Sequence, residues 1–178
     1  AAFNQTTFLS VANFYPAKAQ LSLVAAFAEA YKMCPEIKLL MAGEEANGEI
    51  AEEVRRFIEA HNLQNTVTVL GHCDRRELSR HYSQSHAFVL PSIYEGYSVS
   101  AIEAATFGLP LIMTDVGGAR DLIIDSDCGI LLPPIVEDLA NCSPADVEEI
   151  SRNMENRTTP RLIEAFVLTR SALASIPS

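Results

Sequence analysis

Residues 87–115 read AFVLPSIYEGYSVSAIEAATFGLPLIMTD and hold the pattern that decides the fold. Two apolar runs, AFVLPS (87–92) and PLIMTD (110–115), enclose a small-residue turn and a helix pattern that starts near Ser98. Runs that are apolar at nearly every position, instead of every second one, are typical of strands covered on both faces. The stretch therefore predicts a strand, a tight turn, a helix and a second, parallel strand.

The same alternation of strand and helix extends over most of the chain. Four further apolar runs predict strands, at TFLSVA (7–12), IKLLMAG (37–43), TVTVLG (66–71) and GILLPP (129–134). Between the strands, apolar residues recur with the helical period, for example at Ile50, Val54, Phe57 and Ile58. We therefore expect an α/β fold, a doubly wound parallel sheet of about six strands with helices on both faces.

The 178 residues are expected to form a single domain, 1–178, with its core over residues 6–134. After Pro134 the strand pattern stops, and two helices are predicted over 143–157 and 158–175. We expect these C-terminal helices, 143–175, to pack back on the sheet.

Composition argues against several classes of function. A formal net charge of -10 disfavours a nucleic-acid surface, so no nucleic-acid partner is expected. The four cysteines form no C-x-x-C pair and the histidines have no zinc-ligand spacing, so neither a metal centre nor a disulfide framework is predicted. No apolar run is long enough to cross a bilayer, and no P-loop or dinucleotide-binding glycine motif is present. A reducing, cytoplasmic environment and no cofactor are expected.

Two glutamates flank the turn in YEGYSVSAIEAATFG (94–108). In open parallel sheets, ligands bind at the carboxyl ends of the strands, where this turn is predicted to lie. Ser98 is expected to cap the helix, so that the first helix amides can bind a diphosphate. A carboxylate beside a phosphate repels it, and sugar hydroxyls are its natural partners. We therefore expect a nucleotide-sugar, with Glu103 at the ribose and Glu95 at the transferred sugar.

The chain also resembles a known family. EGYSVSAIEAATFGLPLI (95–112) has a Glu-x7-Glu spacing, and TDVGGARDLI and DCGILLPP follow it. FLSVANFYPAKA, LLMAGE, VTVLG and AFVLPS precede it in the family's order. Together these segments resemble the donor-binding half of retaining glycosyltransferases of family 4, over roughly residues 6–134. The resemblance implies a Rossmann-like domain that forms one half of a GT-B fold.

The resemblance implies a role for each matching residue. Glu95 matches the glutamate beside the reacting sugar, Glu103 the ribose-binding glutamate and Lys18 the phosphate-binding lysine. The turn that receives sugar hydroxyls and diphosphate matches Gly96, Tyr97, Ser98 and Val99. The nucleobase of family members usually packs where Gly71, His72 and Cys73 stand.

The resemblance also implies a reaction: transfer of a sugar from a nucleotide-sugar to an acceptor hydroxyl, with retention of configuration and without a metal. The acceptor would be a saccharide or a lipid-linked molecule in polysaccharide or glycoconjugate biosynthesis. It would bind an N-terminal domain that is absent here, and this missing half could bring the parent enzyme peripherally to a membrane. The chain alone is expected to bind donor weakly and to catalyse little or nothing.

Two residues depart from the family pattern. Asn13 stands where an arginine is usual, and it can supply neither the charge nor the paired donors that arginine offers a diphosphate. Lys18 and the helix end would then bind the diphosphate alone, unless Arg120 compensates. His86 stands where an aspartate is common. Either change is compatible with an altered donor or a weakened enzyme.

Two other functions fit the same pattern. The chain could be a non-catalytic nucleotide-binding or assembly module that kept the fold but lost transfer, and Asn13 favours this alternative. An epimerase or a phosphorylase-like enzyme with the GT-B fold is the other hypothesis. The sequence specifies neither the base, the sugar, the acceptor, the linkage nor the oligomeric state.

Overall fold

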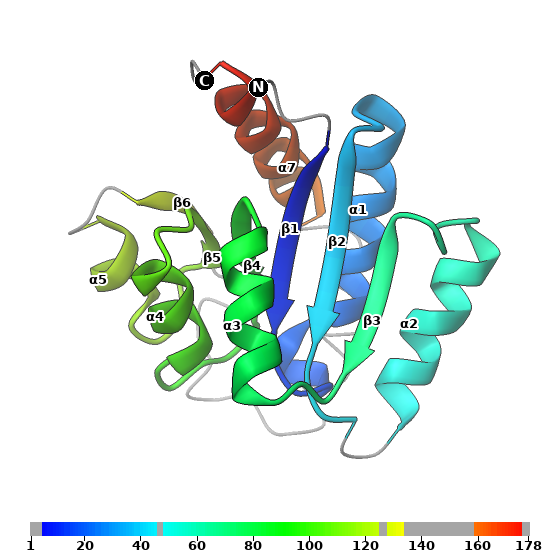
Figure 1. The fold of residues 1–178 in the computed structure, drawn as a ribbon, viewed down its shortest axis with the longest axis horizontal. Helices are drawn as coiled ribbons and strands as arrows, with labels where there is room; N and C mark the ends of the chain where they lie inside the picture. The colour runs from blue at the N-terminus through cyan, green and yellow to red at the C-terminus, as the bar shows by residue number, and fades with distance from the viewer. Residues whose placement is uncertain (1–4, 46–47, 125–127, 134–158, 176–178) are drawn as a thin grey trace.

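The computed structural model describes residues 5–45, 48–124, 128–133 and 159–175. Its strands form one parallel sheet with the order β3-β2-β1-β4-β5-β6 (Figure 1). The strands are β1 (Thr6–Val11), β2 (Ile37–Ala42), β3 (Val67–Gly71), β4 (Ala87–Leu90), β5 (Leu111–Thr114) and β6 (Gly129–Leu132). Each predicted apolar run forms its strand, and the doubly wound parallel sheet is confirmed.

Helices connect successive strands. The helical elements are η1 (Pro16–Lys18), α1 (Gln20–Met33), α2 (Glu49–Ala60), α3 (Arg75–Gln84), α4 (Val99–Thr106), α5 (Ala119–Ile124) and α7 (Thr159–Ala174). Helix α7 agrees with the helix predicted over 158–175. The helix predicted over 143–157 lies outside the described residues.

The helices cover both faces of the sheet, because neighbouring residues of a strand point to opposite faces. Phe8 belongs to the apolar cluster under α1, α2 and α7, whereas Leu9 belongs to the cluster under α3, α4 and α5. Figure 1 shows α1 and α7 behind the sheet and α3 and α4 in front of it. This two-sided burial explains why the strands lack polar alternation.

The C-terminal helix α7 packs back on the sheet as expected. Its Phe166 is fully buried and meets Phe8 and Phe27 edge-to-face, with ring centroids 4.7 and 5.6 Å apart. Burying a phenylalanine side chain of this kind contributes about 1.5–3 kcal/mol to stability. Residues from both ends of the chain therefore share one core.

The order of the strands creates a crevice between β1 and β4. The chain leaves β1 towards α1 on one face, and it leaves β4 towards α4 on the other. The loops after these adjacent strands therefore diverge, which is the geometry that binds ligands in open α/β sheets.

The loops after β1 and β2 approach each other closely at one edge of the crevice. A Cβ on Gly43 would lie 2.0 Å from the carbonyl oxygen of Ala12, so a larger residue does not fit.

Candidate functional site

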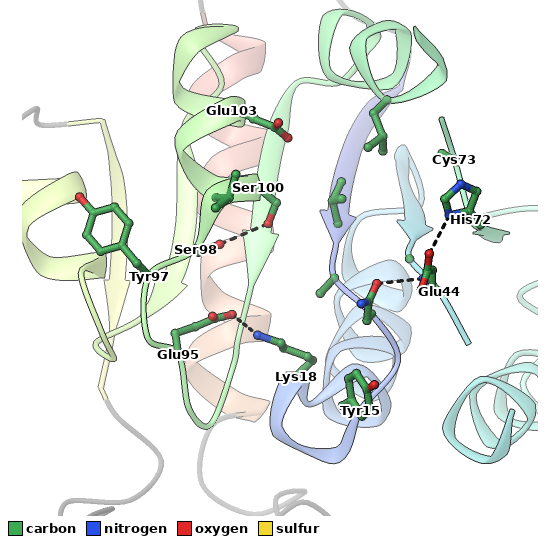
Figure 2. Close-up of a pocket in the computed structure, with 16 residues that line it drawn as sticks. Tyr15, Lys18, Glu44, His72, Cys73, Glu95, Tyr97, Ser98, Ser100 and Glu103 are labelled. Carbon is green, nitrogen blue, oxygen red and sulfur yellow. Dashed lines mark hydrogen bonds and ion pairs between the residues drawn. The ribbon is translucent and has the colours of Figure 1, made fainter. Parts of the chain in front are cut away.

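A cavity of about 530 Å³ lies at the carboxyl ends of β1 and β4 (Figure 2). The loops after β1, β2, β3 and β4 and the start of α4 form its walls. Most of the residues singled out from the sequence line this cavity: Asn13, Lys18, His72, Glu95, Tyr97, Ser98, Val99 and Glu103. Gly71 ends β3 and Gly96 lies in the loop after β4, and neither is part of the wall. The Tyr97 ring points away from the cavity in Figure 2 and packs over Gly118.

Helix α4 begins at the cavity wall as the sequence predicts. The extended Ser98 is the N-cap, and its Oγ accepts a hydrogen bond from the Ala101 amide at 3.2 Å. The amides of Val99 and Ser100 in the first turn have no acceptor among the described residues. These amides and the positive end of the helix dipole favour an anion at this point.

Glu95 is held in an ion pair beside this helix end. Lys18 Nζ lies 2.6 Å from Glu95 Oε1, and the side chains are 23% and 9% exposed. The hydroxyl of the buried Ser92 donates to the same oxygen at 3.0 Å. The Ser92 carbonyl in turn accepts a hydrogen bond from the Thr114 hydroxyl at the end of β5. Glu95 is therefore held by Ser92 in the loop after β4, which Thr114 of β5 supports, and by Lys18 of η1.

Glu103 lies one turn further along α4, and Figure 2 shows its carboxylate pointing into the cavity. The Tyr82 hydroxyl donates to Glu103 Oε2 at 3.1 Å. Among the described residues no lysine or arginine forms an ion pair with Glu103, in contrast to Glu95. One carboxylate at this wall is thus neutralised by a cation and the other is not.

The loops after β1, β2 and β3 form the opposite wall. Asn13 Oδ1 accepts from the Glu44 amide at 3.1 Å, and the Gln20 side chain donates to the Asn13 carbonyl at 2.8 Å. Glu44 Oε1 lies 3.3 Å from His72 Nδ1, and both side chains are largely exposed. Asn13 therefore joins the first two loops, and it also lines the cavity where an arginine was expected from the family pattern.

Two residues connected with the departures from the family pattern lie outside the cavity wall. Arg120, suggested to compensate for Asn13, pairs with Asp115 instead. His86 precedes β4 at the opposite end of the sheet. Its Nδ1 accepts a hydrogen bond from the Thr7 amide at 2.9 Å, so the imidazole caps the start of β1.

Sequence reasoning gave no individual role to several residues of the cavity wall and its support. Tyr15 and Glu44 fall in loops that the strand pattern places at the carboxyl edge, where the site was expected, and both line the cavity. Ser92 ends the strand run AFVLPS (87–92), but nothing in the run indicates a bond to Glu95. Tyr82 comes from α3, and its helical apolar spacing indicates only a core residue.

The model of the family described as glycosyl transferases group 1 matches residues 2–155 of the chain. The chain belongs to this family. The matched residues include all the strands and every described element of the cavity wall. The match confirms the broader part of the resemblance found in the sequence, which is that the chain is a glycosyltransferase domain.

Curated relatives of this group 1 domain are glycosyltransferases. The chain is 29% identical over 125 residues to glycogen synthase of Mycobacterium tuberculosis (strain CDC 1551 / Oshkosh), covering 70% of the chain and 27% of the relative. It is 36% identical over 112 residues to the UDP-N-acetylglucosamine--peptide N-acetylglucosaminyltransferase GtfA subunit of Streptococcus gordonii, covering 62% of the chain and 21% of the relative. The chain therefore spans about a quarter of the length of these relatives.

Solved structures with the same fold include glycosyltransferases of the GT-B type. Sucrose-phosphate synthase from Thermosynechococcus elongatus superposes with a TM-score of 0.65 at 29% identity, over 96% of the chain and 43% of that protein. Pneumococcal O-GlcNAc transferase GtfA, in complex with UDP and GlcNAc, superposes with a TM-score of 0.63 at 24% identity, over 96% of the chain and 32% of that protein. The group 1 domain thus has the architecture of one part of these larger enzymes.

Two further features of the group 1 domain concern metals and membranes. Within the part of the chain that the structure describes, no three His, Cys, Asp or Glu side chains are grouped as metal ligands. None of the described helices combines the length and the apolar character that crossing a membrane requires.

Proposed function

We propose that this group 1 domain is the nucleotide-sugar-binding domain of a retaining glycosyltransferase of family 4. The observation that carries the proposal is the convergence of three elements on one cavity: the Lys18–Glu95 ion pair, the free amides of α4 and the uncompensated carboxylate of Glu103. A nucleotide-sugar has a matching order of groups, because its diphosphate joins a ribose to the transferred sugar. Dinucleotides such as NAD have a similar order of groups, but the sequence has no dinucleotide-binding glycine motif.

The placement of the ligand follows from charge. The diphosphate binds the α4 amides and Lys18, which are the positive groups of the cavity. Glu103 accepts hydrogen bonds from the ribose hydroxyls, and Glu95 lies beside the transferred sugar. The nucleobase packs near His72 on the wall formed by the loop after β3. Complexes of structural neighbours support this choice of ligand: pneumococcal GtfA was solved with UDP and GlcNAc, and Anabaena HepE with UDP-glucose.

The chemistry uses the same groups. The bond between the sugar and the diphosphate breaks, and Lys18 with the α4 amides stabilises the negative charge on the departing phosphate. This is the task that a cation performs in metal-dependent transferases, so metal-independent transfer is proposed. The acceptor hydroxyl attacks from the face that the diphosphate leaves, which retains the configuration, and a phosphate oxygen takes its proton. Glu95 acts by its charge and by positioning the sugar.

The remainder of the enzyme is part of the proposal, since the chain spans about a quarter of its curated relatives. An N-terminal domain binds the acceptor, which is a saccharide or a lipid-linked molecule, and covers the cavity. The parent enzyme acts in the cytoplasm or at the membrane surface. The chain alone binds donor and transfers little or no sugar.

Asn13 supports a second candidate, a non-catalytic nucleotide-binding or assembly module. Within the described residues, Lys18 is the only lysine or arginine that lines the cavity. A diphosphate that meets one cation instead of two is a poorer leaving group. Under this alternative the fold is kept for assembly and transfer is lost.

Titration calorimetry of the chain with UDP-glucose, GDP-mannose and ADP-glucose tests the proposal. We expect one base to bind best, and binding to weaken when the ribose or the diphosphate is removed. If none of these nucleotide-sugars binds, the proposed function is wrong and the assembly module is favoured. If one binds but the complete enzyme transfers no sugar to any acceptor, the non-catalytic nucleotide-binding module is favoured.

A further inference from the structure

Tyr82 joins two helices at the edge of the cavity. It comes from α3, and its hydroxyl lies 3.1 Å from Glu103 Oε2 and 3.2 Å from the carbonyl oxygen of Ser100, both in α4. A phenol has one proton to donate, and the charged carboxylate is the stronger of these two acceptors. The principal bond of this hydroxyl is therefore the one to Glu103.

The Tyr82 ring is held rigidly. It is 2% exposed and stacks on Phe107 with the ring centroids 5.3 Å apart and 20° between their planes. Phe88 of β4 packs against it at 6.4 Å. A ring fixed on two sides cannot follow a moving carboxylate, so the hydroxyl determines where Glu103 Oε2 lies.

The hydroxyl also stays a donor over the physiological range. Burial, with the charge of Glu103 as a second cause, raises the pKa of Tyr82 well above its ordinary value. In the described part of the chain, Glu103 Oε1 has no hydrogen-bond partner, and the side chain faces the cavity. One oxygen is thus held by the protein and the other is left for a ligand.

We propose that Tyr82 is a positioning residue for Glu103, the glutamate that binds the ribose. By fixing one carboxylate oxygen of Glu103, Tyr82 favours binding of a ribose that has both hydroxyls. This inference rests on the proposed function and deepens it, because it names what orients Glu103. Without the phenol, the Glu103 side chain samples several rotamers, and ordering it on binding costs free energy. Tyr82→Phe keeps the ring and removes only the hydroxyl.

A double-mutant cycle with Tyr82→Phe, Glu103→Ala and the double variant tests the inference, with UDP and 2′-deoxy-UDP as calorimetric probes and GDP and ADP pairs run in parallel. Tyr31→Phe is the matched control, because Tyr31 also stacks on a phenylalanine, in α1 and outside the cavity wall. For the base that binds best, we expect Tyr82→Phe to weaken ribonucleotide binding about fivefold, the equivalent of one hydrogen bond. It should leave the weaker 2′-deoxynucleotide nearly unchanged and have no effect in the Glu103→Ala background.

Three outcomes decide the inference, and a fourth tests the proposed function. Loss of ribose discrimination in Tyr82→Phe, with the loss absent beside Glu103→Ala, supports the inference. Parent-like ribonucleotide affinity in Tyr82→Phe overturns it and leaves the proposed function standing. Equal weakening in the presence and absence of Glu103 also overturns it, since a purely structural hydroxyl would act without the carboxylate. Thermal unfolding of each variant identifies such structural loss independently. A parent chain that binds no nucleotide contradicts the proposed function itself.

Discussion

Lys18 and Glu95, 77 residues apart in the sequence, form an ion pair of 2.6 Å in the cavity wall. The only lysine or arginine that the described residues place in this wall is therefore already bound to a carboxylate. An anion that binds Lys18 must compete with Glu95, and its own charge is repelled by Glu95. This relationship leads to opposite predictions for the two residues.

Substituting Glu95 by glutamine should tighten binding of free UDP, by roughly threefold to tenfold for the loss of one partly buried competing charge. Glutamine keeps the size of the side chain but no longer holds Lys18 or repels phosphate. Calorimetry measures the change, and Glu59→Gln on the exposed end of α2 is the control. In the complete enzyme the same variant should lose most of its turnover. Unchanged UDP affinity together with near-normal turnover would contradict both roles of Glu95.

Substituting Lys18 by alanine should have the reverse effect. We expect UDP affinity to fall about tenfold or more, because a charge-assisted contact to phosphate is lost. Uridine, which lacks phosphate, should bind as before, and the salt dependence of UDP binding should decrease. Lys32→Ala, at an exposed lysine of α1, is the matched control. An equal loss for uridine and UDP would show that Lys18 supports the structure and does not contact phosphate.

Asn13→Arg tests whether the departure from the family pattern weakens the site. The added guanidinium should raise UDP affinity, by roughly fivefold for one exposed or half-buried contact. Loss of the Asn13–Glu44 hydrogen bond opposes this gain. Asn13→Gln measures that loss separately, because it alters the bond without adding charge. UDP binding that is weaker in Asn13→Arg than in Asn13→Gln would show that the cavity has no place for a second cation.

His86 predicts how stability depends on pH. Burial lowers the pKa of His86 below its ordinary value of 6.5, and the neutral Nδ1 accepts from the Thr7 amide. Because the folded pKa lies below the unfolded one, the unfolded chain binds more protons between the two values. The contribution of His86 is complete above about pH 6.5 and is lost as the pH falls towards the folded pKa. The free energy of unfolding, measured by urea titration, should decrease from pH 7 to pH 5.

His86→Asp provides the comparison for this pH dependence. Aspartate also offers an acceptor to the Thr7 amide and stays ionised until about pH 4. The variant should therefore lose less stability between pH 7 and pH 5 than the parent chain, while nucleotide affinity stays the same. An identical loss in both chains would assign the pH dependence to other groups.

The sequence predicts the fold well because both-face burial removes the polar alternation from every strand. Phe88 and Val89 illustrate this, since neighbouring residues enter opposite apolar clusters. The Ser98 cap and the place of Glu103 on α4 were also predictable, because both depend on spacing within one helix. Local patterns of this kind are read directly from a sequence.

The partners of the site residues could not be predicted, because they join elements that are distant in sequence. The Tyr82–Glu103 bond spans α3 and α4, and periodicity alone gives Tyr82 an ordinary core position. Arg120 illustrates the opposite error, since its charge suggested a phosphate contact but Asp115, five residues before it, binds it. Tertiary packing decides such pairings.

Mapping of nucleotide-sugar binding by NMR on the ¹⁵N-labelled chain tests the central claim most directly. With the nucleotide-sugar that binds best in calorimetry, the largest amide shifts should occur at Lys18, at Ser98 to Ser100 and at Glu103, with smaller ones at His72. The amides of Thr7 and His86, at the far end of the sheet, should not move. Saturable shifts centred on that far end or on α5, with the start of α4 unaffected, would contradict the account.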